Sequence, residues 1–360
     1  MEITESEVRA AKPEQASAYT FGKLFTDHML QADWDMTTGW GKPRIVPYQP
    51  LKIDTTATSL HYGISAFEGI SVVRNAISGK SQAFRTENNL KSFLAASEHL
   101  DMPAFSTDEL LECLKKLVSI DKSWFPDLPN DTPSQLYLRL SHISTDEVLG
   151  VRTARKTKVY AILNPTTLKP KTLRLKCTSD VFKNWPLGHG NFRIASNFGP
   201  LVPTITDAKN NGFDDVLWTL DGFIKEMTVI NVFAVIKNRY GIVELITPPD
   251  DGCIFNGSVR KSILQLAAEI ERETGGVKVV ERQLSIHEMI SASREGRLQE
   301  FFGCATSCNI QPVSRIVYED EVIELTSGKT GQYPIANYLN NKLTSIMSGP
   351  SDHEWITPFE

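Results

Sequence analysis

The sequence predicts an α+β fold divided into two domains, and three observations support this. The chain has 360 residues, more than a single core usually organises. Segments with alternating apolar residues, typical of strands, are interspersed with segments whose apolar residues recur at helical spacing. Residues 164–171 contain two prolines and two lysines and therefore predict an interdomain linker. We expect a frayed segment at 1–20, a small domain at 21–163 and a large domain at 172–360.

The first domain combines strands and helices. A helical turn is expected within 59–69, and Ser106 is expected to cap the second of two helices because its hydroxyl can accept from a free amide. The two helices are expected at 88–100 and 107–120. The strands are expected at 44–47, 70–74, 81–85, 134–143 and 158–163.

The second domain begins with a strand expected at 172–177. Asp221-Gly222 separates two apolar runs at 215–224 and predicts a hairpin with a type I′ turn, which needs positive φ at both positions. A further hairpin is expected at 232–246. An amphipathic helix is expected at 258–274, ending at Gly275-Gly276, followed by a helix at 286–295 and a strand at 300–303.

Composition excludes several classes of function. Hydrophobic residues make up 41% of the chain and charged residues 22%, as in ordinary globular proteins. The net charge of -5 and the absence of a basic run argue against nucleic acid as a partner. No apolar stretch has the length of a membrane span. The five scattered cysteines predict reduced thiols, no pattern suggests a metal site, and the polar, acidic N-terminus leads us to expect a cytoplasmic protein.

Two stretches carry the functional signal, His189–Pro200 and Asp221–Phe233. Together they resemble the active-site core of the branched-chain aminotransferases, which are class IV pyridoxal-phosphate enzymes. The resemblance extends from Phe21–Met29 to His353–Trp355, nearly the whole chain. It implies a D-amino-acid-aminotransferase-like (fold type IV) architecture, with a small N-terminal α/β domain and a larger C-terminal domain that has a β-barrel-like core. It also implies a homodimer and a small-molecule substrate.

The resemblance assigns cofactor contacts. Such enzymes use a carboxylate to keep the ring nitrogen protonated, and an arginine and helix N-termini to hold the phosphate. Glu226, five residues before Asn231, matches the carboxylate. Arg85 matches the phosphate-binding arginine, although an arginine at a strand end is usually just a surface residue. The remaining residues similar to the family's phosphate contacts are Gly257, Ser258, Val259 and Thr306.

The resemblance also assigns a substrate pocket. Tyr62 and Phe67 match the family pattern L-H-Y-x-x-x-x-F-E-G, and Tyr137 and Arg139 match L-Y-x-R. Alone, a Tyr-x-Arg pair in a strand more often marks one face of an exposed sheet. In the family these positions line the substrate pocket and help to hold the α-carboxylate. Two residues of a loop beside phosphate and substrate complete the set, Thr306 and Ser307.

The pattern breaks at Arg193, which stands where the family has its Schiff-base lysine. A guanidinium, with a pKa above about 12, offers no free amine to the cofactor's aldehyde. Ala195-Ser196 replaces two small residues that are usually glycines, and Phe198 replaces a tyrosine, which argues against one deliberate substitution. We expect Arg193 to point into the former cofactor cavity, and pyridoxal phosphate to be bound only noncovalently or not at all.

Three hypotheses follow. The first is a repurposed enzyme of specialised metabolism that isomerises, cyclises, decarboxylates or dehydrates a small anionic or carboxylate-bearing molecule. Arg193 would stabilise developing negative charge, while Tyr62, Tyr137 or His189 moves protons. A lone histidine in such a loop is more often merely solvated. The alternatives are a branched-chain aminotransferase of weak or unusual activity with noncovalently held pyridoxal phosphate, and a non-catalytic homologue that binds a ligand or a partner.

Overall fold

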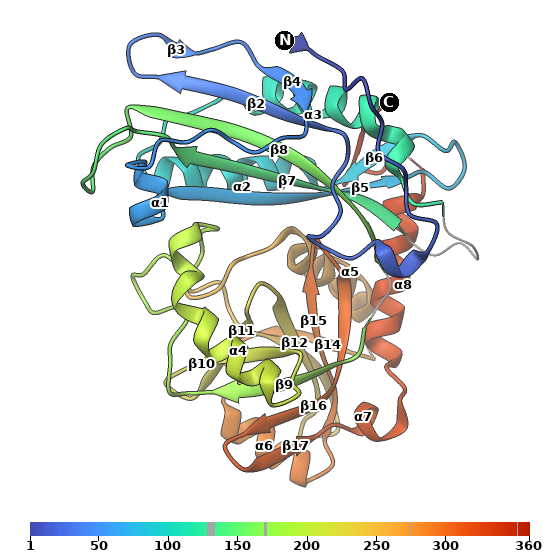
Figure 1. The fold of residues 1–360 in the computed structure, drawn as a ribbon. Helices are drawn as coiled ribbons and strands as arrows, with labels where there is room; N and C mark the ends of the chain where they lie inside the picture. Colours follow the sequence, from blue (N-terminus) through green and yellow to red (C-terminus); the bar gives the residue numbers. More distant parts are fainter. Residues whose placement is uncertain (128–133, 169–170, 275, 351) are drawn as a thin grey trace. The chain divides into compact units, whose positions relative to one another are not determined.

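A computed structural model describes residues 1–127, 134–168, 171–274, 276–350 and 352–360 (Figure 1). The chain forms two compact units. The first consists of Met1–Lys169, Phe192–Ser196 and Thr344–Glu360, and the second of Pro170–Asn191 and Asn197–Leu343. The expected large domain at 172–360 therefore differs from the second unit. The reason is backbone pairing, because Ile194 bridges to Ala66 and the C-terminal strand pairs with a strand of the first unit.

The first unit is built on a mixed sheet with helices α2 and α3 against one face (Figure 1). The strand order is β1-β4-β2-β8-β7-β5-β6-β18, with β3 paired to β2. The strands are β1 (Glu2–Ile3), β2 (His28–Asp35), β3 (Gly39–Trp40), β4 (Arg44–Pro47), β5 (Ser65–Arg74), β6 (Ser81–Phe84), β7 (Ser134–Ser144), β8 (Lys156–Thr167) and β18 (Ile356–Pro358). The helices are η1 (Ala16–Ala18), α1 (Thr58–Tyr62), α2 (Thr86–His99), α3 (Thr107–Asp121) and η2 (Lys122–Trp124).

The expected linker is partly strand. β8 continues to Thr167, which pairs with Ser134 at the start of β7, so the ladder extends beyond the strand expected at 158–163. The register with β7 overrides the local turn signal of Pro165. Residues 169–170 of the expected linker lie outside the described residues. By contrast, Ser106 caps α3 as predicted, accepting from the Glu109 amide at 3.2 Å.

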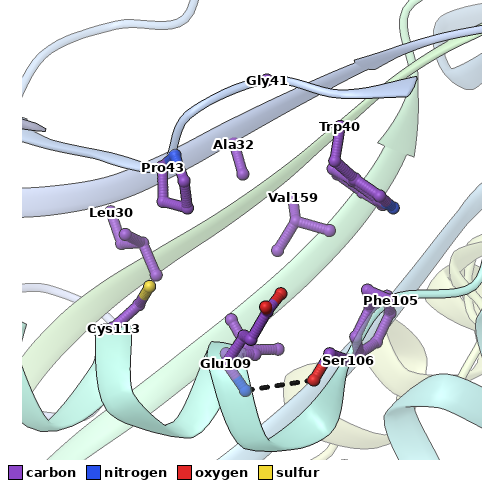
Figure 2. Close-up of a pocket in the computed structure, with 11 residues that line it drawn as sticks. Leu30, Ala32, Trp40, Gly41, Pro43, Phe105, Ser106, Glu109, Cys113 and Val159 are labelled. Carbon is purple, nitrogen blue, oxygen red and sulfur yellow. Dashed lines mark hydrogen bonds between the residues drawn. The ribbon is translucent and has the colours of Figure 1, made fainter. Parts of the chain in front are cut away.

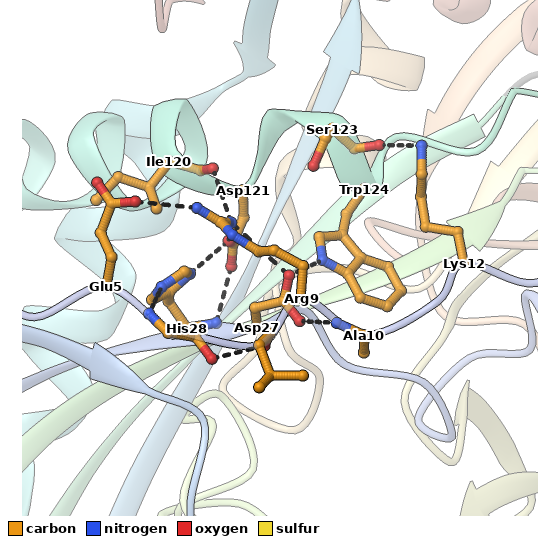
Figure 3. Close-up of polar contacts among 12 residues, drawn as sticks. Glu5, Arg9, Ala10, Lys12, Asp27, His28, Ile120, Asp121, Ser123 and Trp124 are labelled. Carbon is orange, nitrogen blue, oxygen red and sulfur yellow. Dashed lines mark hydrogen bonds and ion pairs between the residues drawn. The ribbon is translucent and has the colours of Figure 1, made fainter.

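The N-terminal segment is anchored rather than frayed (Figure 3). β1 adds to the sheet edge by parallel pairing with β4. The Ser6 amide then donates to His28 Nε2 at 2.9 Å, and the other ring nitrogen of this buried histidine lies 2.6 Å from Asp121 Oδ1. Arg9 lies 3.3 Å from the same carboxylate oxygen and 3.1 Å from Glu5. The expectation of a frayed 1–20 is therefore wrong, because distant partners satisfy this polar segment.

The second unit has its own mixed sheet, in the order β11-β10-β9-β16-β15-β12-β13-β14, with β17 paired to β16. The strands are β9 (Leu173–Thr178), β10 (Asp215–Leu220), β11 (Phe223–Met227), β12 (Asn231–Lys237), β13 (Val243–Thr247), β14 (Lys278–Glu281), β15 (Leu298–Ala305), β16 (Asn309–Tyr318) and β17 (Glu321–Glu324). The helices are η3 (Ala195–Asn197), η4 (Gly199–Leu201), α4 (Val202–Asn210), α5 (Ser258–Thr274), α6 (Ile286–Arg294), α7 (Thr326–Thr330) and α8 (Pro334–Ser348), of which η3 begins and α8 ends in segments of the first unit.

Two local predictions in this unit are confirmed. Asp221 and Gly222, between β10 and β11, have φ values of 51° and 76°, the two positive angles that a type I′ turn requires. α5 has the expected limits, 258–274, because its apolar residues recur at helical spacing between two glycine-containing stretches. Each unit also has a separate hydrophobic core, which includes Phe93 in the first and Phe301 in the second.

Candidate active site

β5 and β7 bring together three of the residues assigned to substrate binding. Gly69 of β5 lies opposite Arg139 of β7 in the antiparallel ladder, so Phe67 and Tyr137, each two residues away along its strand, project from the same face. The Arg139 guanidinium lies 3.9 Å from the centroid of the Phe67 ring, a cation–π contact. A Cβ at position 69 would collide with the Tyr137 hydroxyl. Glycine is therefore needed for the tyrosine to lie across β5.

Arg193 lies beside a buried carboxylate of the same unit. Its carbonyl accepts from the Phe67 amide at 2.9 Å, which ties the segment 192–196 to β5. Its Nε lies 3.4 Å from Glu68 Oε1, and both side chains are largely buried. Burial raises the pKa of the Glu68 carboxyl, and the Arg193 charge is the strongest opposing influence. A buried guanidinium and a buried carboxylate thus compensate each other at this position.

Tyr62 and Arg85 occupy other parts of the first unit. Tyr62 ends α1 with its side chain partly exposed, and its hydroxyl accepts from the Gly150 amide at 3.2 Å. Arg85 precedes α2 with a left-handed φ of 51°. Its guanidinium stacks 3.9 Å from the centroid of the Trp355 ring, which lies just before β18. This stacking fixes the arginine in one orientation, half-buried and still charged.

Glu226 is the centre of a buried polar cluster in the second unit. Lys183 Nζ and Asn184 Nδ2 donate to Glu226 Oε1 at 2.6 and 3.0 Å. Asn231 Nδ2 and the Phe255 amide donate to Oε2 at 3.4 and 3.3 Å. Glu226 and Lys183 are both almost completely buried, so the ion pair and the amide donors together offset the cost of removing these charges from water.

The N-terminus of α5 lies next to this cluster. Asn231, which donates to Glu226, also accepts from the Gly257 amide at 3.3 Å and donates to the Phe255 carbonyl at 2.6 Å. A Cβ at Gly257 would come within 2.9 Å of the Asn231 amide oxygen, so this approach requires glycine. Ser258 begins the helix. The first-turn amides of a helix form a site that favours anions.

Of the other sequence-assigned residues of this unit, Val259 is buried in the first turn of α5, and the remaining three lie in loops. Thr306 and Ser307 form the turn between β15 and β16, closed by the Cys308 amide donating to the Ala305 carbonyl at 3.2 Å. Thr306 is buried. His189 is exposed, and its carbonyl accepts from Asn197 Nδ2 at 2.8 Å.

The sequence-assigned residues therefore form two groups, one within each unit. In the first unit they are Tyr62, Phe67, Arg85, Tyr137, Arg139 and Arg193, and in the second they are His189, Glu226, Gly257, Ser258, Val259, Thr306 and Ser307. Their assignment to catalysis or binding stays a prediction.

Three contacts were missed from the sequence: Glu68 beside Arg193, and Lys183 and Asn184 beside Glu226. An isolated lysine ten residues before Arg193 carries no spacing signal. The role of Lys183 could have been predicted only by assuming that Glu226 is buried, because a buried carboxylate needs a cation beside it.

Comparison with known proteins places the chain in a family. The family model described as "Amino-transferase class IV" matches residues 65–316. The chain is a class IV aminotransferase-family protein. It is 33% identical over 356 residues to the mitochondrial branched-chain-amino-acid aminotransferase of Bos taurus, covering 96% of this chain and 88% of that protein. It is also 33% identical over 369 residues to branched-chain-amino-acid aminotransferase 2 of Bacillus subtilis (strain 168), covering 99% and 96%.

Solved structures confirm the α+β fold of this class IV protein. The branched-chain amino acid aminotransferase from Escherichia coli superposes with a TM-score of 0.71 at 19% identity, covering 93% of this chain and 99% of that one. The enzyme of Thermobaculum terrenum in its PLP-form gives 0.71 at 21% identity, covering 93% and 99%. The fold is thus the class IV aminotransferase fold, a mixed α/β fold with a curled half-barrel sheet.

Proposed function

We propose that this protein is a pyridoxal-phosphate-dependent aminotransferase of branched-chain amino acids that holds its cofactor without a covalent lysine link. The observation that carries the proposal is the buried Glu226, which is kept in place by side-chain and backbone donors beside the N-terminus of α5. A buried carboxylate next to an anion-binding helix terminus suits a cofactor that has a ring nitrogen at one end and a phosphate at the other. The named relatives act on branched-chain amino acids.

The residues present fit this cofactor. Glu226 would accept a hydrogen bond from the ring nitrogen, and the first turn of α5 would hold the phosphate, with Thr306 beside it. The family resemblance proposes Arg85 as a further phosphate ligand. A Cβ at Gly257 would lie 2.9 Å from Asn231 Oδ1, and the Gly257 amide already donates to that oxygen, so a phosphate would meet the later first-turn amides of α5. When bound, pyridoxal phosphate supplies an electron sink for the bonds at the substrate's Cα. Arg139 would bind the substrate carboxylate.

Arg193 limits the activity. Its guanidinium stays protonated and supplies no amine, so the residue can neither bond to the cofactor nor accept the Cα proton. Another group must move that proton, and Tyr62, Tyr137 and His189 are the candidates. We therefore expect slow transamination and a cofactor that dissociates readily.

A second candidate function rests on the contact between Arg193 and Glu68. A guanidinium fixed by a buried carboxylate is a preorganised positive charge, which can stabilise an enolate or oxyanion. The protein would then isomerise, cyclise, decarboxylate or dehydrate a small carboxylate-bearing molecule, as in specialised metabolism. The family relationship favours the aminotransferase over this reading.

The discriminating experiment is transamination of leucine with 2-oxoglutarate by wild type, Arg193→Lys and the exposed control Arg315→Lys, with and without added pyridoxal phosphate. The proposal predicts weak, cofactor-dependent activity in wild type and in the control. It predicts a gain of at least about 100-fold in Arg193→Lys, the lower range of what a positioned acid–base group contributes. Inactivity of all three proteins would overturn the aminotransferase proposal and favour the second candidate.

Oligomeric state and location belong to the same proposal. We propose a homodimer, as the family resemblance implies, and sedimentation velocity at two concentrations tests it.

Relatives are named as cytosolic and as mitochondrial enzymes, and we propose a cytoplasmic location for this chain. In the described residues, no helix is long and apolar enough to cross a membrane.

A further inference from the structure

The carboxylate of Glu226 is surrounded by four donors in the second unit. Lys183 Nζ and Asn184 Nδ2 donate to its Oε1 at 2.6 and 3.0 Å. Asn231 Nδ2 and the Phe255 amide donate to its Oε2 at 3.4 and 3.3 Å. An ionised carboxylate has about four lone-pair positions. A ring nitrogen that donates a hydrogen bond to Glu226 must therefore replace one of these donors.

Three of the four donors are fixed by the backbone around them. Asn184 and Asn231 each donate as well to a backbone carbonyl, at 2.8 and 2.6 Å. The donor of Phe255 is itself a backbone amide. Lys183 is held less tightly, because it lies at the end of a flexible four-carbon stem and its contact with the Met227 carbonyl is long, at 3.4 Å. The ammonium group of Lys183 is therefore the donor that is displaced most easily.

A second carboxylate, that of Asp215 at the start of β10, lies near Lys183. Asp215 Oδ1 accepts from the Thr228 hydroxyl at 2.5 Å, and Thr228 follows Met227, whose carbonyl Lys183 contacts. Burial raises the pKa of the Asp215 carboxyl, and the charge of Lys183 is among the influences that oppose this shift. Two carboxylates, Glu226 and Asp215, thus lie within the influence of one ammonium group.

We propose that Lys183 exchanges partners when pyridoxal phosphate binds, leaving Glu226 to the ring nitrogen and pairing with Asp215. This inference rests on the proposed function, because it requires that cofactor. After the exchange, two positive charges face two carboxylates, so neither carboxylate is left buried without a partner. The cofactor must displace an ion pair in order to bind, and Lys183 therefore lowers the cofactor affinity of this chain.

The test is isothermal titration calorimetry of the full chain with two phosphate esters. Pyridoxine 5′-phosphate has the ring nitrogen and the phosphate but no aldehyde, so no lysine can bond to it covalently. Benzyl phosphate has no ring nitrogen. Lys183→Met should bind pyridoxine 5′-phosphate at least about ten-fold more tightly than wild type, because no ammonium group has to leave Glu226. Its affinity for benzyl phosphate should not rise.

Two further variants keep the test decisive even if Lys183→Met does not fold. Asp215→Asn keeps an acceptor for Thr228 but removes the second partner of the ammonium group, so it should bind pyridoxine 5′-phosphate about ten-fold more weakly than wild type. The control Lys225→Met removes an ammonium group that pairs with Asp251 and should bind like wild type. Equal affinities of wild type and Asp215→Asn would overturn the exchange. Failure of every protein to bind pyridoxine 5′-phosphate would overturn the proposed function as well.

A ligand bound in the pocket beside α3 would give a different result (Figure 2). That pocket, of about 210 Å³, lies in the first unit, and the residues that line it include neither lysine nor arginine. Lys183 and Asp215 belong to the second unit. Unchanged affinities for both esters in all the variants would indicate binding away from Glu226 and would overturn the exchange.

Discussion

At the scale of single residues, two buried carboxylates depend on a cation placed beside each of them. Glu68 has Arg193 at 3.4 Å, and Glu226 has Lys183 at 2.6 Å. A buried charge without a partner costs several kcal/mol, so each cation contributes to folding whatever its role in catalysis. Arg193 thus has a structural role as the cation beside the buried Glu68.

Replacing Arg193 should change how stability depends on pH. Burial already raises the pKa of Glu68 above its ordinary value of 4.5, and loss of the Arg193 charge should raise it further. Above pH 4.5 the unfolded chain releases this proton before the folded chain does, so stability falls with rising pH until the folded pKa is passed. Arg193→Gln should therefore resemble wild type at low pH and be clearly less stable at neutral pH.

Urea unfolding at a series of pH values measures this difference. Arg315→Gln, an exposed position on β16, is the control and should leave the pH profile of wild type unaltered. A stability loss in Arg193→Gln that is the same at every pH would contradict the coupling between Arg193 and Glu68.

Lys183→Met should destabilise the protein by about 3–5 kcal/mol, because it leaves Glu226 buried without its cation. The matched variant is Lys225→Met. Lys225 pairs with Asp251 at 2.7 Å, but that carboxylate is partly exposed and water can replace the ammonium group. Denaturant unfolding should therefore show a smaller loss for Lys225→Met. If the two variants lost the same free energy of unfolding, Lys183 would stabilise the buried Glu226 no more than Lys225 stabilises the partly exposed Asp251.

The roles proposed for Glu226, Arg85 and the β5 and β7 residues come from the sequence, because each residue lies within a contiguous family pattern. The ion pairs of Lys183 with Glu226 and of Arg193 with Glu68 could not be predicted from such patterns. Lys183 and Glu226 are 43 positions apart, and only the folded second unit brings them together. The contact between Arg193 and Glu68 likewise depends on the bridge between Ile194 and Ala66, which no local pattern encodes.

At the scale of elements, the N-terminal segment contributes stability through long-range contacts. The Ser6 amide donates a hydrogen bond to His28 Nε2. Arg9 pairs with Asp121, whose carboxylate is also hydrogen-bonded to the other ring nitrogen of His28, Nδ1 (Figure 3). Without the segment, a buried histidine nitrogen loses its donor and a buried carboxylate loses a cation. Such groups are costly to leave unsatisfied.

Removal of residues 1–12 should therefore lower the free energy of unfolding by about 1–3 kcal/mol, the desolvation penalty for an unsatisfied buried group. Denaturant unfolding measures it. Lys12→Ala, which removes exposed contacts of the segment with the Ser123 carbonyl and Asp127, should stay within about 0.5 kcal/mol of wild type. A truncated protein as stable as the full chain would contradict the anchoring of the segment.

Elements with a strong local signal were predictable, and elements that depend on distant partners were not. α5 has a regular apolar face, and the hairpin at Asp221-Gly222 has the two residues that tolerate positive φ. β1 has two residues and exists only by pairing with β4. β8 continues through Pro165 because β7 continues alongside it. In β1 and at the end of β8, pairing with a distant strand overrides the local sequence preference.

At the scale of the whole molecule, the fold was predictable because its motifs extend over nearly the entire chain. The boundaries of the compact units were not, since 192–196 and 344–360 return to the first unit after long excursions. This matters for function, because Arg193 lies in one of these returning segments.

The central claim is that pyridoxal phosphate is held without a covalent bond. It is tested most directly by mass spectrometry of the protein incubated with pyridoxal phosphate and treated with borohydride. The native spectrum of wild type should show bound cofactor, and the denatured spectrum should show the unmodified chain. Arg193→Lys should retain one cofactor-derived adduct after denaturation. A stoichiometric adduct on the denatured wild-type chain would contradict the claim, as would the absence of bound cofactor from its native spectrum.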